Sequence, residues 1–149
     1  MSYDYSENIL VQESAGNLLR DELGWDVRFA YNTEVLGKNG TFGRESYHEI
    51  LLLRYFREAL KKLNPWINDN QISEAQKILE NRLSTSSLLQ VNEEKYFLIR
   101  DGIPVTVKKP NGQTETKKAA VIDFKNPDNM ENNYFLAVKE LKIHGDLYR

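Results

Sequence analysis

The stretch RDGIPVTVKKPNGQT, residues 100–114, divides the sequence into two parts with different patterns. Gly102 ends the helical pattern that precedes it, and Pro104 prevents that helix from continuing. The segments IPVTVKK and ETKKAAVIDF then flank Asn111-Gly112, a dipeptide typical of a tight β-hairpin turn. The sequence therefore predicts helices before Gly102 and antiparallel strands after it.

Three stretches in the first part begin with a serine that is followed three residues later by Glu or Gln, the spacing of a helix capping box. We expect helices over residues 7–23, 46–62, 73–83 and 87–101, the last three starting at Ser46 with Glu49, Ser73 with Gln76 and Ser87 with Gln90. The first helix should be capped by Ser6 and end at Gly24, with an apolar stripe of Val11, Ala15, Leu18 and Leu19. The second helix is apolar nearly all round, which predicts a helix packed on both sides.

Strands are expected in WDVRFAYN and over residues 103–109, 117–125 and 133–143, with the last three forming a meander. The fold class is therefore α/β, locally α+β, with helices followed by antiparallel strands. Nothing in the sequence marks a domain boundary, so residues 1–149 are treated as a single domain.

The composition is that of an ordinary globular domain. The chain has 149 residues, 40% of them hydrophobic, and a formal net charge of -2. It contains no cysteine, which excludes disulfides and thiolate metal sites. The start MSYDYSENIL lacks the pattern of a signal peptide, and no apolar run approaches the roughly 20 residues of a membrane span. A cytoplasmic protein is expected, with no membrane partner.

Other candidate ligand-binding motifs receive little support. The glycines at 37, 40 and 43 lack the spacing of a phosphate-binding loop. His48 and His144 are far apart and not paired on a helix, which gives a zinc site little support. Four lysines bracket the hairpin tip and could contact DNA phosphates or simply form a solvated edge: Lys108, Lys109, Lys117 and Lys118.

One tripeptide, Glu140-Leu141-Lys142, has the form of a nuclease active site. On a strand, its two-residue spacing places both charged side chains on one face, and an upstream carboxylate such as Asp123 could share a metal ion with Glu140. The charged residues around it suit an exposed strand better than the apolar central strand that such a site requires. Two interpretations of Glu140-Leu141-Lys142 therefore remain open: an active site, or a tripeptide that only resembles one.

Three longer stretches, REALKKLNP, LLQVNEEKYFLIRDGIPV and VIDFKNPDNMENNYFLAVKELKIHG, give the sequence a family resemblance. In order and spacing they resemble the N-terminal region of the R subunit of type I restriction-modification enzymes. The resemblance runs from Glu13 onward and is strongest between Leu52 and Gly145. In that family an Arg-Pro-Asp and a strand carrying Glu-x-Lys follow the segment that ends this sequence.

The resemblance implies an incomplete restriction-endonuclease-like domain of the PD-(D/E)xK superfamily, lacking its catalytic hairpin. Glu140-Leu141-Lys142 would then be a decoy, Asp123 a structural residue, and no complete metal site would be present. Glu13 would be an accessory catalytic residue at the first helix, although Glu7 or Glu22 could take that place, or Glu13 could be an ordinary surface residue.

The parent enzyme implied by the resemblance uses Mg²⁺ and ATP, acts on double-stranded DNA, and works with methyltransferase and specificity subunits. The fragment itself is expected to be inactive and to bind neither cofactor. Two other readings stay open. One is a free-standing magnesium-dependent nuclease that uses Asp123, Glu140 and Lys142, and the other is a non-catalytic module whose helical half docks on partner subunits.

Overall fold

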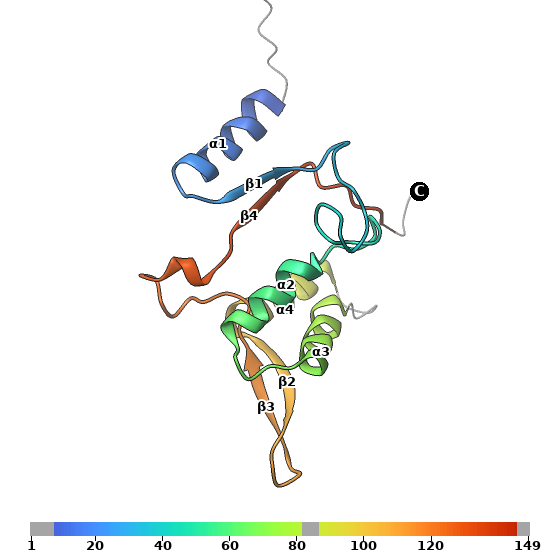
Figure 1. Cartoon of the computed structure of the whole chain (residues 1–149), viewed down its shortest axis with the longest axis vertical. Coiled ribbons are helices and arrows are strands. Elements are labelled where there is room, and N and C mark those ends of the chain that lie inside the picture. Colours follow the sequence, from blue (N-terminus) through green and yellow to red (C-terminus); the bar gives the residue numbers. More distant parts are fainter. Residues whose placement is uncertain (1–7, 82–86, 146–149) are drawn as a thin grey trace, which may run out of the picture. The chain divides into compact units, whose positions relative to one another are not determined.

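The computed structural model describes residues 8–81 and 87–145 (Figure 1). The chain divides into two compact units, one drawn from Met1–Leu52 with Tyr134–Arg149 and the other from Leu53–Asn133. Helices and strands are mixed, which confirms the α/β class. In chain order the elements are η1 (Asn8–Glu13, a π-helix), α1 (Ser14–Asp21), β1 (Asp26–Phe29), α2 (Leu53–Leu63), α3 (Asp69–Glu80), α4 (Leu88–Asp101), β2 (Ile103–Lys108), β3 (Thr114–Ala119), η2 (Met130–Asn132, a 3-10 helix) and β4 (Leu136–Lys139).

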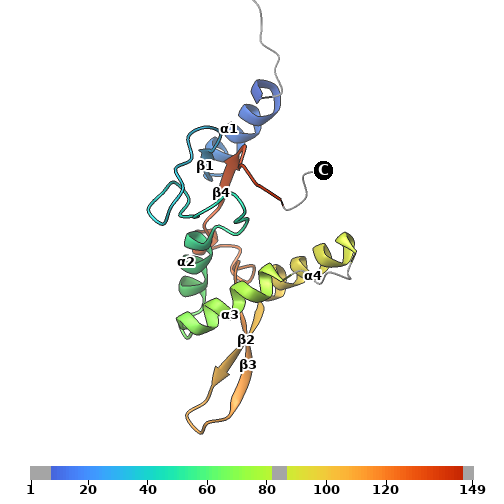
Figure 2. The ribbon, with the colours of Figure 1, turned by 90° about the vertical axis from the view of Figure 1, so that its right-hand side faces the viewer.

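The first unit is built on a parallel pair of strands, β1 and β4, which lie side by side in Figures 1 and 2. The backbone N–H of Asp26 donates to the carbonyl of Phe135, and that of Ala30 to the carbonyl of Lys139. The predicted meander is therefore wrong for its third strand, which pairs with β1 and covers only part of 133–143. Sequence patterns locate strands, but they do not identify a partner about a hundred residues away.

α1 lies against this strand pair at Gly16. A Cβ added there would meet Val27 Cγ1 at 3.4 Å, so the helix backbone approaches the strands closely because glycine has no side chain. The predicted apolar stripe does not face the core, since residues Val11 and Leu18 are 59% and 57% exposed. Gly24, at φ +68°, ends the helical region as expected. The proposed cap, Ser6, lies outside the described residues.

The second unit has a small core between its helices and the β2–β3 hairpin. α3 packs against β2, and its residues Gln71 and Glu74 bond the backbone of Thr106. The fully or nearly buried apolar residues of this unit are Phe56, Leu60, Ile72, Ala75, Ile103, Val105 and Ala119. Among the residues that the structure describes, no helix is both long enough and apolar enough to cross a bilayer.

The hairpin of β2 and β3 confirms the predicted turn. The two strands pair antiparallel from Ile103 with Ala119 to Lys108 with Thr114, and Gly112 adopts φ +84° in the connection. Positive φ is the conformation for which the Asn-Gly signal is selected. The register puts the buried residues of the hairpin on one face.

Two side chains from outside the hairpin bond its backbone, one on β2 and one just after β3. On β2, the Glu74 carboxylate accepts bonds from the backbone N–H and hydroxyl of Thr106, each at 3.0 Å. Beyond β3, the Asn64 amide accepts from Ala120 N–H and donates to Ala120 C=O, both at 2.8 Å. These amide and carboxylate groups occupy backbone positions that would otherwise invite strand addition.

The predicted helix over 46–62 begins later than expected. Glu49 does accept bonds from the N–H groups of Glu45 and Ser46, but α2 starts only at Leu53. The carbonyl of Glu49 accepts a bond from the Arg44 guanidinium, and the turn at Ser46 does not extend into a helix. α2 is also amphipathic, with Phe56 and Leu60 buried, and is not packed on both sides as predicted.

The other two capping boxes have different outcomes. Ser87 and Gln90 form the predicted box at the start of α4. The expected start at Ser73 is wrong, because α3 begins at Asp69 behind a capping box made by Asn68 and Gln71. The Ser73 hydroxyl donates to the carbonyl of Asp69 within the helix. The predicted end at residue 83 lies outside the described residues.

The predicted strand over 117–125 ends at Ala119, which leaves the IDF segment outside the sheet. Asp123 accepts bonds from the backbone N–H groups of Lys125 and Asn126, at 3.0 and 3.2 Å. An aspartate bonded to the backbone two residues onward forms a turn, which competes with strand pairing.

Candidate functional site

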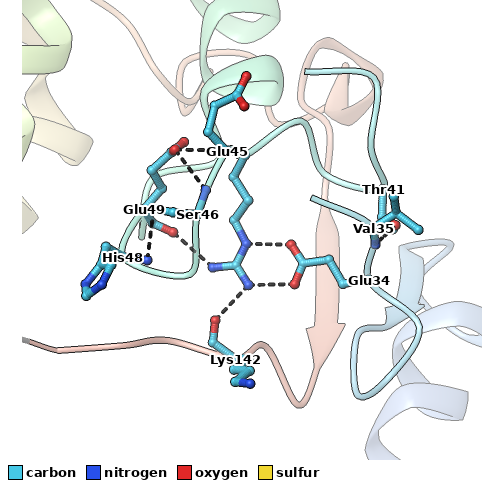
Figure 3. A network of polar contacts seen from close by, with 9 residues as sticks. Glu34, Val35, Thr41, Glu45, Ser46, His48, Glu49 and Lys142 are labelled. Carbon is cyan, nitrogen blue, oxygen red and sulfur yellow. Dashed lines mark hydrogen bonds and ion pairs between the residues drawn. The ribbon is translucent and has the colours of Figure 1, made fainter. Parts of the chain in front are cut away.

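A buried ion pair lies where the chain leaves the parallel strands of the first unit (Figure 3). The Arg44 guanidinium donates a hydrogen bond to each carboxylate oxygen of Glu34, at 2.5 and 2.6 Å. Both side chains are almost completely shielded from solvent. The same guanidinium donates to the carbonyls of Glu49 and Lys142. The hydrogen-bonded Glu34 carboxylate raises the pKa of Arg44, so the group stays charged. Arg44 therefore ties the loop after β1 to the segment after β4.

A cavity of about 520 Å³ opens beside this ion pair, at the carboxyl ends of β1 and β4. Two of the residues lining it, Asn32 and Glu140, have positive φ angles of 55° and 53°. Such angles are uncommon outside glycine and reflect local constraint. The cavity is lined by Ala30, Tyr31, Asn32, Glu34, Tyr47, Glu140, Leu141 and Lys142.

The Glu140-Leu141-Lys142 tripeptide does not lie on a strand. β4 ends at Lys139, and the left-handed backbone of Glu140 turns the chain away from it. The alternation that would place both side chains on one strand face therefore does not apply. Lys142 Nζ lies 4.7 Å from the ring centroid of Tyr47, and the Lys142 carbonyl accepts the bond from Arg44.

Asp123 lies in the second unit, so neither unit by itself contains the three residues of the free-standing nuclease reading. Its carboxylate accepts side-chain bonds from Asn126 at 2.8 Å and Asn132 at 3.0 Å, in addition to the two backbone N–H groups. The hydrogen bond from Asn126 makes the largest contribution to lowering the pKa of Asp123, and the bond from Asn132 makes the next largest. These contacts give Asp123 a structural role in its loop.

Glu13 is exposed at the end of η1, immediately before α1. It does not join a metal-binding cluster, because no group of three or more His, Asp or Glu residues among the described positions is arranged to hold a metal ion. Within residues 8–81 and 87–145, Glu13 therefore does not belong to a complete Mg²⁺ site.

The lysines of the hairpin differ in their surroundings. Glu115 accepts an ion pair from Lys109 at 3.1 Å and a longer one from Lys117 at 3.6 Å. Lys109, and to a smaller extent Lys117, lowers the pKa of Glu115. Lys117 also lies over the Trp66 ring, 5.4 Å from its centroid. The register puts Lys108 and Lys118 on the opposite face of the hairpin.

The glycine-rich loop is closed by its own hydrogen bonds. The N–H of Gly37 donates to Arg44 C=O, that of Gly40 to Gly37 C=O, and that of Thr41 to Val35 C=O. A phosphate-binding loop instead presents free N–H groups to its ligand. Because the N–H groups of Gly37, Gly40 and Thr41 already have partners, they are consistent with the expectation that this loop does not bind phosphate.

Sequence reasoning missed Arg44, Glu34 and Tyr47. Arg44 and Tyr47 are three residues apart, but Glu34 is ten residues and Lys142 is 98 residues from Arg44, so no short motif contains all of them. The available signal was weaker: Arg44 is a charged residue directly after a glycine-rich loop and before a tyrosine, a position where a long side chain can fold back on the loop.

Comparison with known proteins places the sequence in a family. Residues 4–149 match the family described as the type I restriction enzyme R protein N terminus. No solved structure matches the chain.

Two curated relatives are informative. The type I restriction enzyme HindI endonuclease subunit of Haemophilus influenzae is 29% identical over 123 residues, which cover 83% of this chain and 11% of the relative. The putative type I restriction enzyme MjaIXP endonuclease subunit of Methanocaldococcus jannaschii is 26% identical over 100 residues, covering 67% of this chain and 9% of the relative. The chain thus spans about a tenth of the length of these relatives. Because the family match extends over nearly all its residues, the chain belongs to the family of type I restriction enzyme R protein N-terminal regions.

Proposed function

We propose that the chain is the front part of the endonuclease domain of a type I restriction R subunit. The whole protein would hydrolyse phosphodiester bonds of unmodified double-stranded DNA with Mg²⁺, after ATP-driven translocation, together with methyltransferase and specificity subunits in the cytoplasm. The observation that carries this proposal is the family match over residues 4–149. The names of both relatives, which are endonuclease subunits, support it.

The 149-residue chain by itself is proposed to be inactive, with the catalytic carboxylates and lysine supplied by another part of the parent. Two observations support this. Glu140 lies beyond the end of β4 with a left-handed backbone, and Asp123 already accepts four hydrogen bonds in its own loop. When bound in the parent, Mg²⁺ would stabilise the charge that develops on the phosphate and activate water.

The test is a cleavage assay on duplex DNA with Mg²⁺ or Mn²⁺. The chain should leave the DNA intact, and a longer form of the protein that includes the family's Arg-Pro-Asp and Glu-x-Lys should gain a metal-dependent nuclease site. Cleavage by the 149-residue chain that is lost in Glu140→Ala, but kept in the surface control Glu58→Ala, would make the internal tripeptide the active site.

A second candidate function, docking on partner subunits, is favoured by α4. This helix of 14 residues has no buried residue, and residues Leu88 and Leu89 are 81% and 79% exposed. Tyr96 and Phe97 are exposed on the same helix. Exposed apolar side chains that form a contiguous patch are a feature of protein interaction sites.

The docking function is tested by co-purification with the methyltransferase and specificity subunits. A Leu88→Lys/Leu89→Lys variant should lose these subunits, while Asn92→Lys, on the same helix, should retain them. Equal recovery with both variants would exclude α4 as the docking surface.

A further inference from the structure

The two histidines of the chain lie next to each other in the first unit. The ring centroids of His48 and His144 are 5.7 Å apart, with the rings inclined at 76°. His48 comes from the loop that precedes α2, and His144 from the segment that follows β4. The two histidines are far apart in the sequence, which argued against a shared site. The pairing of β1 with β4 brings their segments together.

Backbone contacts hold the two histidines in this arrangement. The N–H of His144 donates to the carbonyl of Tyr47 at 2.9 Å, directly beside His48. The His144 ring also meets the Tyr47 ring edge to face, at 5.3 Å between centroids. Nearby, Arg44 bonds the carbonyl of Lys142 and so fixes the same two segments. The fold therefore brings together the two backbone segments that carry the histidines.

Both imidazoles are available to a ligand. Neither ring is held by a hydrogen bond or ion pair to another residue within 8–81 and 87–145. His48 is exposed and His144 is half-buried, so an ion from solution can reach them. Imidazole nitrogen is a preferred ligand of Zn²⁺, Ni²⁺ and Cu²⁺, whereas Mg²⁺ prefers oxygen.

We propose that His48 and His144 together bind one transition-metal cation of the Zn²⁺, Ni²⁺ or Cu²⁺ class. With metal–nitrogen bonds of about 2.0–2.1 Å, two imidazoles on one ion have ring centroids roughly 4.5 to 6.4 Å apart. The observed 5.7 Å lies within this range. Since the described residues offer no third protein ligand, water completes the coordination.

The charges around the pair limit how tightly the ion is held. Lys142 Nζ and the Arg44 guanidinium both face the ring of Tyr47, and both oppose a second cation. The Arg44 charge is offset by Glu34, which leaves Lys142 as the main repulsive group. Replacing Lys142 with Gln should therefore tighten metal binding.

A bound ion joins the loop of His48 to the segment of His144. Metal binding would thus add a second link between the two segments that Arg44 already connects. It would stabilise the folded chain, because the unfolded chain does not hold its two histidines together. This effect is separate from DNA cleavage and does not depend on the proposed nuclease function.

The test is a titration of the 149-residue chain with Zn²⁺ or Ni²⁺ by calorimetry at about pH 7.5, repeated at about pH 5, where protons compete for imidazole. We expect one ion per chain, a rise in melting temperature, and loss of binding at the lower pH. His48→Gln and His144→Gln should each weaken binding about tenfold or more, because one ligand is lost. The electron paramagnetic resonance spectrum with Cu²⁺ should show two nitrogen ligands.

The controls separate this site from general surface binding. Mg²⁺ should neither bind nor raise the melting temperature, and the double variant His48→Gln/His144→Gln should fold with an unchanged circular dichroism spectrum. Binding that is no tighter in the unaltered chain than in the double variant would overturn the proposal. So would a Cu²⁺ spectrum with a single nitrogen ligand.

Discussion

The Arg44 guanidinium and the Glu34 carboxylate form a two-point ion pair in which the side chains are 0% and 3% exposed. Each charge is desolvated, and the other compensates for it. Removing one partner leaves a buried charge without compensation, which is costlier than losing an ion pair at the surface.

Arg44→Met should therefore lower the free energy of unfolding by about 3–5 kcal/mol, as measured by urea denaturation. Arg44→Lys should also destabilise, because one ammonium group cannot reproduce the two-point geometry. The matched control is Arg20→Met, which removes an arginine from a solvent-exposed pair with Asp21 and should change stability little. Equal effects at the two positions would contradict the role given to Arg44.

A second prediction concerns Asn64, which is 3% exposed and whose amide makes three hydrogen bonds. Its partners are the carbonyl of Leu60 and both backbone groups of Ala120. Asn64→Ala should cost roughly 2–3 kcal/mol of unfolding free energy, because buried backbone groups lose their partners. Asn64→Asp should also destabilise, since a carboxylate cannot donate to two carbonyls. Asn92→Ala, on the exposed surface of α4, is the control, and a loss of stability there as large as at Asn64 would contradict the prediction.

Acid stability should depend on Asp123, whose pKa is lowered from 3.8 by the bonds from Asn126 and Asn132. A carboxyl with a lowered folded pKa contributes stability above its unfolded pKa and loses that contribution as pH falls through the folded value. The free energy of unfolding should therefore fall as pH drops below about 4, and it should fall less steeply in Asp123→Asn. Asp128→Asn, in the same loop, controls for the loss of one negative charge. Identical pH profiles for Asp123→Asn and the unaltered chain would refute this role.

The outer edge of β4 should promote self-association. The backbone groups of Phe135 and Lys139 bond to β1. Those of Leu136 and Val138, which alternate with them, therefore point away from β1. No described residue of this unit pairs with these outward-pointing backbone groups. Such an edge can add a strand from a second copy. Sedimentation velocity should show dimer increasing with concentration, and Val138→Pro should reduce it by removing an edge donor. A chain that stays monomeric at high concentration would count against an open edge.

Local chemistry allowed part of this structure to be predicted. Ser87 with Gln90, Gly102, and Asn111-Gly112 each act over a few residues, and each does what its pattern predicts. Ser46 with Glu49 shows that a local pattern can form without its helix, because the side-chain bonds of Glu49 are present but α2 begins only at Leu53. The pairing of β1 with β4, the Arg44–Glu34 ion pair and the meeting of His48 with His144 depend on contacts between distant segments, for which a single sequence carries no local signal.

The hairpin lysines give the last prediction, which concerns contact with duplex DNA in the proposed function. Lys108 and Lys118 share one face of the hairpin, whereas the charges of Lys109 and Lys117 are partly neutralised by Glu115. If the hairpin contacts phosphates, Lys108→Gln/Lys118→Gln should weaken binding to any sequence and reduce the salt dependence of log K by about 2 units, because each phosphate contact contributes roughly 0.9. Glu115→Gln should do the opposite, since it releases two lysines from their ion pair. Fluorescence anisotropy with labelled duplexes at several salt concentrations measures both effects.

Lys38→Gln, in the first unit, is the control for the loss of one positive charge. A hairpin variant that binds with unchanged affinity and salt slope would assign these lysines to a solvated edge, the alternative that the sequence left open.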